Sequence, residues 1–171
     1  MDVLDRLLAH DVWTTRQLLH AAAQLDDAHL DRRSDVDNRS LRECFLHIIK
    51  NMEVWTDLLH ERPVQPRLGE QPTIDELLAR LGAAGQEFAA VARKIGREGR
   101  WDDVYTDPLD DPPTTKTYGG TIAHLITHSM HHRAQAMYML EQLGVRDHVE
   151  GDVLSWEATA FGWHDAPTPH R

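Results

Sequence analysis

The chain has 171 residues, of which 41% are hydrophobic, and it carries a formal net charge of −10. This acidic balance argues against a nucleic-acid partner, because phosphates require a basic binding face. Cys44 is the single cysteine, which excludes an intramolecular disulfide and favours a reducing compartment.

Length and composition together predict one globular domain over residues 1–171, large enough to bury a hydrophobic core. The first residues lack the basic and then apolar pattern of a secretory signal. No run approaches the roughly 18 apolar residues that a membrane-spanning helix needs. We therefore expect a soluble, cytoplasmic protein that makes no contact with a membrane.

Four amphipathic helices are predicted, because apolar residues recur at steps of three and four residues. In chain order, their expected ranges are residues 3–25, 41–61, 73–96 and 118–143. The polar stretches 26–39 and 97–116 contain many turn-forming residues and are expected to be loops. Within the second of these, Trp101, Val104 and Tyr105 indicate a short extended patch.

The predicted helix starts carry capping signals. Residues 40–43 and 73–76 each fit a capping box, with Ser or Thr followed three residues later by Glu. Thr117 is expected to cap the fourth helix. In the third helix, Gly82 and Gly85 each lower intrinsic helix stability by about 1 kcal/mol relative to Ala. Packing against another helix must therefore hold this segment.

The end of the chain predicts one more small element. Gly144 ends the fourth helix, residues 153–156 indicate a short helical segment, and residues 167–171 are expected to fray. The fold class is thus all-α, a four-helix bundle with a short C-terminal helical segment. The first and third connections between helices look too long for tight hairpins, so patterning alone leaves the topology open.

Four histidines lie within nine residues of the fourth helix: His124, His128, His131 and His132. A helix turns by about 100° per residue, so residues four apart form a slowly drifting stripe. Two imidazoles at this spacing can chelate one divalent ion. They are also compatible with hydrogen-bonded side chains and no ion. His47 lies at the margin of the apolar face of the second helix, a position that is also typical of a histidine bonded to a neighbouring residue.

The segment from Ser40 through His47 to Trp55, together with the block His128-Ser-Met-His-His132-Arg-Ala-Gln135, resembles the DinB/YfiT-like family. The resemblance covers most of the chain in helix order and length. It implies a bundle of up-down-down-up topology. This sequence departs from the family pattern at Ala134, where the family often has Gly. The change is expected to affect packing or an oligomer contact.

The resemblance also implies a divalent metal bound by His47, His128 and His132. Three neutral imidazoles leave coordination positions free, as in catalytic rather than closed structural sites. Zn or Ni is the expected ion, with Fe or Mn as alternatives, since imidazole suits several of these metals. A ferritin-like di-iron site is disfavoured because it needs Glu-x-x-His on two helices. The Glu of a helical metalloprotease motif is also absent.

Within the family, characterised members include transferases and isomerases that use low-molecular-weight thiols. The resemblance therefore implies a metal-dependent enzyme that activates a thiol or water for transfer to, or hydrolysis of, a small electrophile. The alternative is a non-catalytic metal-binding protein of a stress response. A homodimer is expected because the family commonly forms one. No residue stands out as a general base, although His124 and His131 are candidates.

Residues near the expected site extend this hypothesis. Asn51, Gln135 and Thr121 are candidates to hold the ligand imidazoles through hydrogen bonds. Cys44 is expected to be an ordinary small apolar residue rather than a catalytic one. Substrate specificity is expected to reside in the loops and the C-terminal segment, where four aromatic residues are candidates to line a pocket: Trp101, Tyr105, Trp156 and Trp163.

Overall fold

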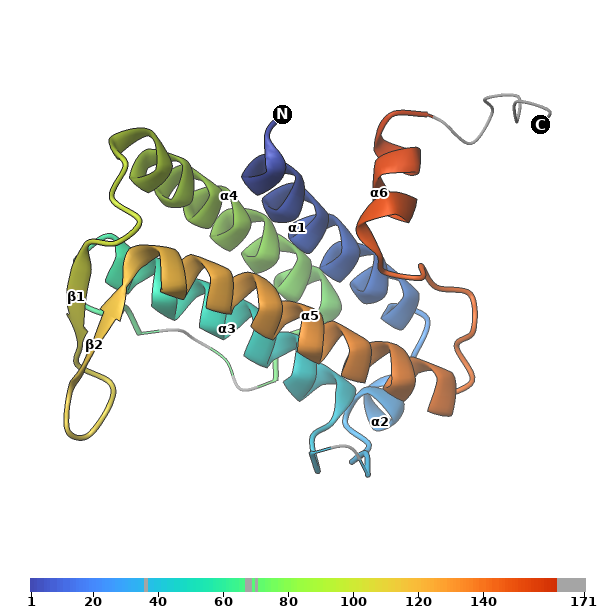
Figure 1. Ribbon diagram of the computed structural model, residues 1–171. Helices are drawn as coiled ribbons and strands as arrows, with labels where there is room; N and C mark the ends of the chain where they lie inside the picture. Colours follow the sequence, from blue (N-terminus) through green and yellow to red (C-terminus); the bar gives the residue numbers. More distant parts are fainter. Residues whose placement is uncertain (36, 67–68, 70, 163–171) are drawn as a thin grey trace.

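Four long helices dominate the computed structural model, which describes residues 1–35, 37–66, 69 and 71–162 (Figure 1). They are α1 (Val3–Ala22), α3 (Leu41–Leu59), α4 (Ile74–Glu98) and α5 (Tyr118–Gln142). Two short helices, α2 (Asp27–Leu30) and α6 (Val153–Ala160), and two strands, β1 (Val104–Asp107) and β2 (Thr114–Thr117), complete the described fold. The predicted all-α bundle with a C-terminal helical segment is confirmed.

The four long helices form a closed ring of contacts. Both α1 and α3 pack against α4 and against α5. Figure 1 shows α1 and α5 running in one direction and α3 and α4 in the opposite one. This is the up-down-down-up topology that the family resemblance implied. Because α3 and α4 are parallel, the chain has to return along the bundle between Leu59 and Ile74.

The helix starts follow the predicted capping chemistry. Ser40 and Glu43 exchange hydrogen bonds in a complete capping box, as do Thr73 and Glu76. The Thr117 side chain accepts a hydrogen bond from the Gly120 amide at the start of α5. Free amide groups at helix starts need such partners. The sequence therefore located these three starts to within a residue.

Two regions predicted as loops contain regular structure. The short helix α2 lies inside the stretch 26–39, where the Asp26 carboxylate caps it through the His29 amide. The stretch 97–116 holds most of an antiparallel hairpin in which Val104 pairs with Thr117. The loop prediction was therefore wrong at α2 and at β2, whereas Val104 and Tyr105 of the predicted extended patch lie in β1. Segments of four residues are too short to leave a periodic apolar signal.

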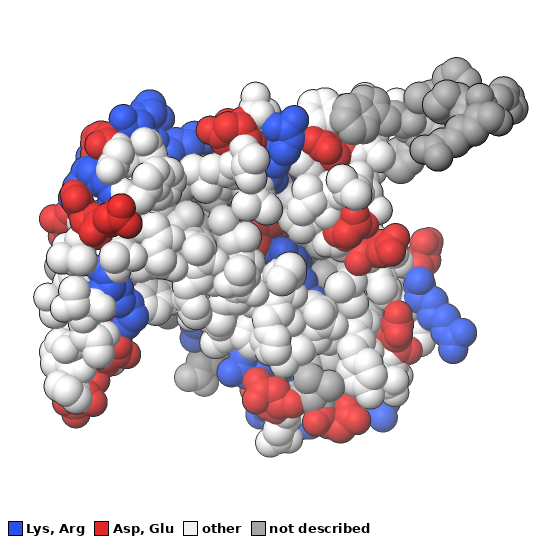
Figure 2. Space-filling view, in the orientation of Figure 1, with Lys and Arg blue, Asp and Glu red and all other residues white. Residues whose placement is uncertain are grey.

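The core fills the space between the long helices. Its largest fully buried side chains include Leu18, Leu19, Phe45, Ile49, Leu81, Phe88 and Leu125. Charged side chains are sparse over the α5 face in Figure 2 and gather toward the edges of the view. Among the described residues, no helix combines the length and the apolarity that crossing a membrane requires.

Two of the three glycines of α4, Gly82 and Gly85, face different surroundings, and this difference gives a test of the packing. A Cβ at Gly85 would lie 2.5 Å from Val12 Cγ2 on α1, whereas one at Gly82 would come no closer than 3.9 Å to Arg16. Gly82→Ala should raise the free energy of unfolding by about 0.5–1 kcal/mol through helix propensity. Gly85→Ala should lower it by about 1–3 kcal/mol through overpacking.

Urea denaturation of both variants and the parent protein measures these changes. The double variant Gly85→Ala with Val12→Ala is the matched control, because it relieves the collision and should recover stability relative to Gly85→Ala alone. Equal stabilisation by Ala at both glycines would contradict the close approach of α1 and α4.

Candidate metal centre

Three histidines meet at the seam between α3 and α5. His47 comes from α3, while His128 and His132 lie one turn apart on α5 and project from the same face. His128 Nε2 lies 3.3 Å from His47 Nε2 and 3.2 Å from His132 Nε2. One ligand atom from each of the three histidines lies within 4.8 Å of the others. The sequence predicted these three residues, and the structure brings them together.

The spacing of these nitrogens suits a single ion. Two nitrogens bound at 2.0–2.1 Å to one tetrahedral ion lie roughly 3.3 Å apart. The Nε2 separations of 3.3 Å from His128 to His47 and 3.2 Å from His128 to His132 agree with that value. The side chains therefore need little movement to hold a divalent cation between them.

Gln135 fixes the orientation of the His132 ring. Its Oε1 lies 2.6 Å from His132 Nδ1, and because an amide oxygen only accepts, His132 Nδ1 carries the proton. The Nε2 of a neutral His132 is then an unprotonated lone pair facing the other two rings. The Gln135 amide nitrogen lies 3.2 Å from His131 Nε2 and donates to it. The predicted orienting role of Gln135 is consistent with this geometry.

Asn51 reaches the same point from α3. Its amide nitrogen lies 3.1 Å from His47 Nε2, and 3.3 and 3.2 Å from the Nδ1 and Nε2 atoms of His128. Because this group can only donate, His47 Nε2 and one of the two His128 nitrogens are acceptors that carry lone pairs. An ion placed between the nitrogens requires this amide to turn away from them. Thr121, the third candidate, is instead bonded to Tyr105 and to the Thr117 carbonyl.

The environment of the cluster keeps its imidazoles neutral. Burial, aided by neighbouring positive charge, lowers the pKa of His47 and of His128 to about 4. Burial also lowers the pKa of His132, although its bond to Gln135 opposes this. Neutral imidazoles present the lone pairs that a metal ion requires. The cluster is thus ready for a cation at neutral pH without first losing protons.

A cavity of about 410 Å³ lies at His124, one helical turn from His128 on α5. Trp55, Lys116, Gly120 and His124 are among the residues that line it. The exposed His124 ring lies between the rings of Trp55 and His128, with centroid distances of 5.8 and 5.2 Å. Sequence reasoning did not single out Trp55 for this cavity, because its helical spacing is also that of a core residue.

None of the three described aromatic residues predicted as pocket lining lines the cavity at His124, although Tyr105 lines a separate pocket with Glu61 and Arg100. Trp101 lies against Gly96 and Gly119, and Trp156 is buried with its ring 6.2 Å from that of His10. Tyr105 stacks on Tyr118 at 5.4 Å. Trp163, like residues 167–171, lies outside the described residues. The described aromatics of this set thus stabilise the ends and the α6 side of the bundle.

The fold and the site together define a helical bundle protein with a three-histidine cluster compatible with a metal ion. The model of the DinB superfamily matches residues 10–136, a range that contains all three histidines. The chain belongs to this superfamily. A solved structure, that of a DinB-like protein from Bacillus subtilis, has the same fold, with a TM-score of 0.64 and 13% sequence identity. The match covers 85% of this chain and 96% of that one. No curated protein matches the chain.

Cys44 lies near the cluster but faces the core. It is fully buried, and its thiol donates to the His132 carbonyl oxygen at 3.4 Å. Burial raises the pKa of this thiol to about 12. A thiol that stays protonated and inaccessible is a poor nucleophile.

We therefore expect Cys44 of the folded protein to react with 5,5′-dithiobis(2-nitrobenzoate) at least a hundredfold more slowly than the same residue in urea-unfolded protein. The absorbance of the released thiolate follows the reaction, and Cys44→Ser, which should give no signal, is the control. Rapid reaction under native conditions would contradict the buried position of the thiol.

Proposed function

We propose that this protein is a divalent-metal-dependent enzyme in which His47, His128 and His132 hold the ion. The reaction is the transfer of a low-molecular-weight thiol to a small electrophilic substrate, or the hydrolysis of that substrate. Zn or Ni is the proposed ion. One observation carries the proposal, namely three histidine nitrogens facing one another at coordination spacing, next to a cavity.

The donor set supports a reactive rather than a structural role for the ion. Structural zinc sites are closed by four protein ligands, whereas catalytic sites use three and keep a position open. The cluster found among the described residues has three members. A divalent ion bound there would supply Lewis acidity, by which a thiol or a water molecule loses its proton near neutral pH.

The other residues of the site have distinct proposed tasks. Gln135 holds the His132 ring so that Nε2 faces the ion. The Asn51 amide, once turned from the lone pairs, offers a hydrogen-bonding group beside the reacting molecules. The cavity beside His124 and Trp55 receives the substrate and limits its contact with water.

A non-catalytic metal-binding protein is the alternative function, and it makes a different prediction. An ion that only supports the fold should raise the melting temperature without promoting any thiol-dependent reaction. The open cavity beside the histidines favours the enzyme, since a purely structural ion has no need of one.

The test is a thiol-transfer assay with Zn- or Ni-loaded protein, glutathione and 1-chloro-2,4-dinitrobenzene. In this reaction a carbon–sulfur bond forms, chloride leaves and the thiol proton passes to solvent. The rate should fall at least a hundredfold in His47→Ala, because the ion is lost. It should stay unchanged in the control His60→Ala, which removes an exposed histidine at the end of α3.

Other low-molecular-weight thiols, including bacillithiol and mycothiol, are assayed in the same way. The protein could instead bind the ion and gain thermal stability, yet form no product above the uncatalysed rate with any thiol or by hydrolysis. This result would overturn the proposed enzymatic function and support the non-catalytic alternative.

A further inference from the structure

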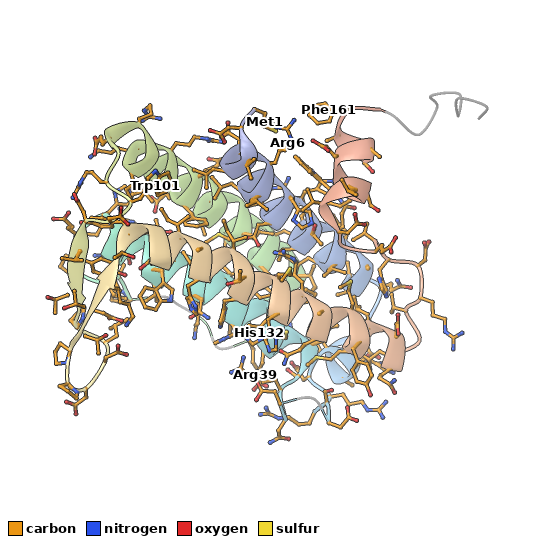
Figure 3. The ribbon with its side chains drawn as sticks, in the orientation of Figure 1. Met1, Arg6, Arg39, Trp101, His132 and Phe161 are labelled. Carbon is orange, nitrogen blue, oxygen red and sulfur yellow. The ribbon has the colours of Figure 1, made fainter. Side chains whose placement is uncertain are left out.

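The cavity at His124 lies between the β1–β2 hairpin and the histidine cluster. Figure 3 shows the hairpin at one end of the bundle and His132 further along α5. The described lining of the cavity contains one lysine, Lys116 of the hairpin, and no arginine or carboxylate. The way in which Lys116 is bonded therefore decides whether the cavity offers a charge to a bound molecule.

Every hydrogen-bond donor of the Lys116 ammonium group is already used. An ammonium group has three N–H donors. Lys116 Nζ donates to Asp107 Oδ2, to Asp110 Oδ2 at 2.7 Å and to Thr114 Oγ1 at 3.1 Å. The positive charge is therefore compensated within the hairpin, and no donor remains for an anion in the cavity.

The hairpin keeps Lys116 in this position. The Asp107 side chain is only 1% exposed, and a buried carboxylate needs a compensating charge. The ammonium group consequently stays with Asp107 instead of turning to a ligand. Its Nζ atom lies 5.2 Å from the centre of the Trp55 ring. Lys116 thus forms the hairpin side of the cavity and covers part of the indole.

The hydroxyl groups of the lining are also engaged. Thr121 Oγ1 donates to the Thr117 carbonyl oxygen at 3.0 Å and accepts from the Tyr105 hydroxyl at 2.8 Å. Thr117 Oγ1 accepts from the Gly120 amide at 3.0 Å. These threonines therefore offer few hydrogen bonds to a molecule in the cavity.

Aromatic rings form the remaining walls. Trp55 from α3 and His124 from α5 line the cavity, with ring centroids 5.8 Å apart and an angle of 69° between the ring planes. Flat rings pack well against such walls, either edge to face or offset. The volume of about 410 Å³ is near the lower end of the range for small-molecule sites. It suits one aromatic ring with its substituents.

The position of the cavity along α5 matches the distance to the expected reacting atom. His124 lies one turn before His128, about 5.4 Å along the helix axis, and the two ring centroids are 5.2 Å apart. In the proposed function, the thiol sulfur lies about 2.3 Å from the ion and the reacting carbon about 3–3.5 Å further on. A carbon at that distance is level with His124, where the cavity begins. A ring that contains this carbon extends into the cavity.

We propose that the cavity selects an electrophile with a single uncharged aromatic ring. Trp55 holds the ring, and the bonding of Lys116 to Asp110 makes charged substrates unfavourable. A carboxylate would find no free donor on Lys116, whereas a cation would meet its positive charge. The choice of an electrophile rests on the proposed function, but the binding of the ring requires neither the ion nor the reaction.

The test is a fluorine-19 NMR titration of the metal-free full chain with probes of similar size. They are 3-fluoronitrobenzene, which is uncharged, 3-fluorobenzoate, an anion, and 3-fluorobenzylammonium, a cation. The uncharged probe should bind at least tenfold more tightly than either charged one. Trp55→Ala should weaken its binding at least tenfold, whereas Trp55→Phe, which keeps a ring, should retain most of it.

A matched control separates the cavity from general effects of losing a tryptophan. Trp13→Ala removes a partly buried tryptophan between α1 and α4, and it should leave the binding of 3-fluoronitrobenzene unchanged. Equal affinity for the three probes, no binding of 3-fluoronitrobenzene, or binding that persists in Trp55→Ala would overturn the proposal.

Asp110→Asn tests the exclusion of charge. It removes one of the two carboxylates from Lys116 at a partly exposed position. The affinity for 3-fluorobenzoate should then rise at least threefold, while that for 3-fluoronitrobenzene stays the same. Asp75→Asn removes an exposed carboxylate at the start of α4 and should change neither affinity. No gain for the anion in Asp110→Asn, or an equal gain in Asp75→Asn, would contradict the assigned role of the Lys116 bonding.

These outcomes are distinct from those of the proposed function. Trp55-dependent binding of the uncharged probe by a protein without thiol-transfer activity would support the cavity assignment and contradict the proposed enzyme. An active metal-loaded enzyme that binds the three probes alike would do the reverse.

Discussion

The site depends on one electrostatic constraint, the facing of imidazole lone pairs across the seam between α3 and α5. His47 and His128 accept from the same amide group of Asn51, and His132 is held with its proton on the far nitrogen by Gln135. The Nε2 atoms of His128 and His132 lie 3.2 Å apart, so a shared proton or a bound cation between them removes the repulsion that two bare lone pairs would have. A fold that holds them there gains most from a bound cation, so the arrangement has the properties of a metal site.

The packing behind the cluster holds the imidazoles in these positions. Arg133, which directly follows His132 on α5, forms a buried ion pair with Asp11 of α1. Burial raises the pKa of Asp11, and the guanidinium opposes that shift. Breaking such a pair by removing one partner typically costs about 3–5 kcal/mol, because a charge is left uncompensated. The pair therefore fixes the turn of α5 that presents His132, while the opposite face of that turn forms the site.

The sequence was informative where its signals were long or chemically specific. Apolar periodicity located four helices, capping boxes located the starts of α3 and α4, and the spacing from His128 to His132 placed two imidazoles on one face. The extended patch at Val104 and Tyr105 was predicted, but its pairing with β2 was not, because a four-residue strand of polar residues has no clear alternation. The homodimer and the cellular compartment stay predictions.

The central claim is that His47, His128 and His132 bind one divalent ion, and metal analysis tests it most directly. Tag-free protein is analysed by inductively coupled plasma mass spectrometry after exposure to Zn, Ni, Mn and Fe, beside His128→Ala and the control His20→Ala, an exposed histidine of α1. The account predicts about one ion per chain in the parent and the control, and loss of that ion in His128→Ala. A parent protein that stays metal-free with every ion, or a His128→Ala variant that keeps full occupancy, would contradict it.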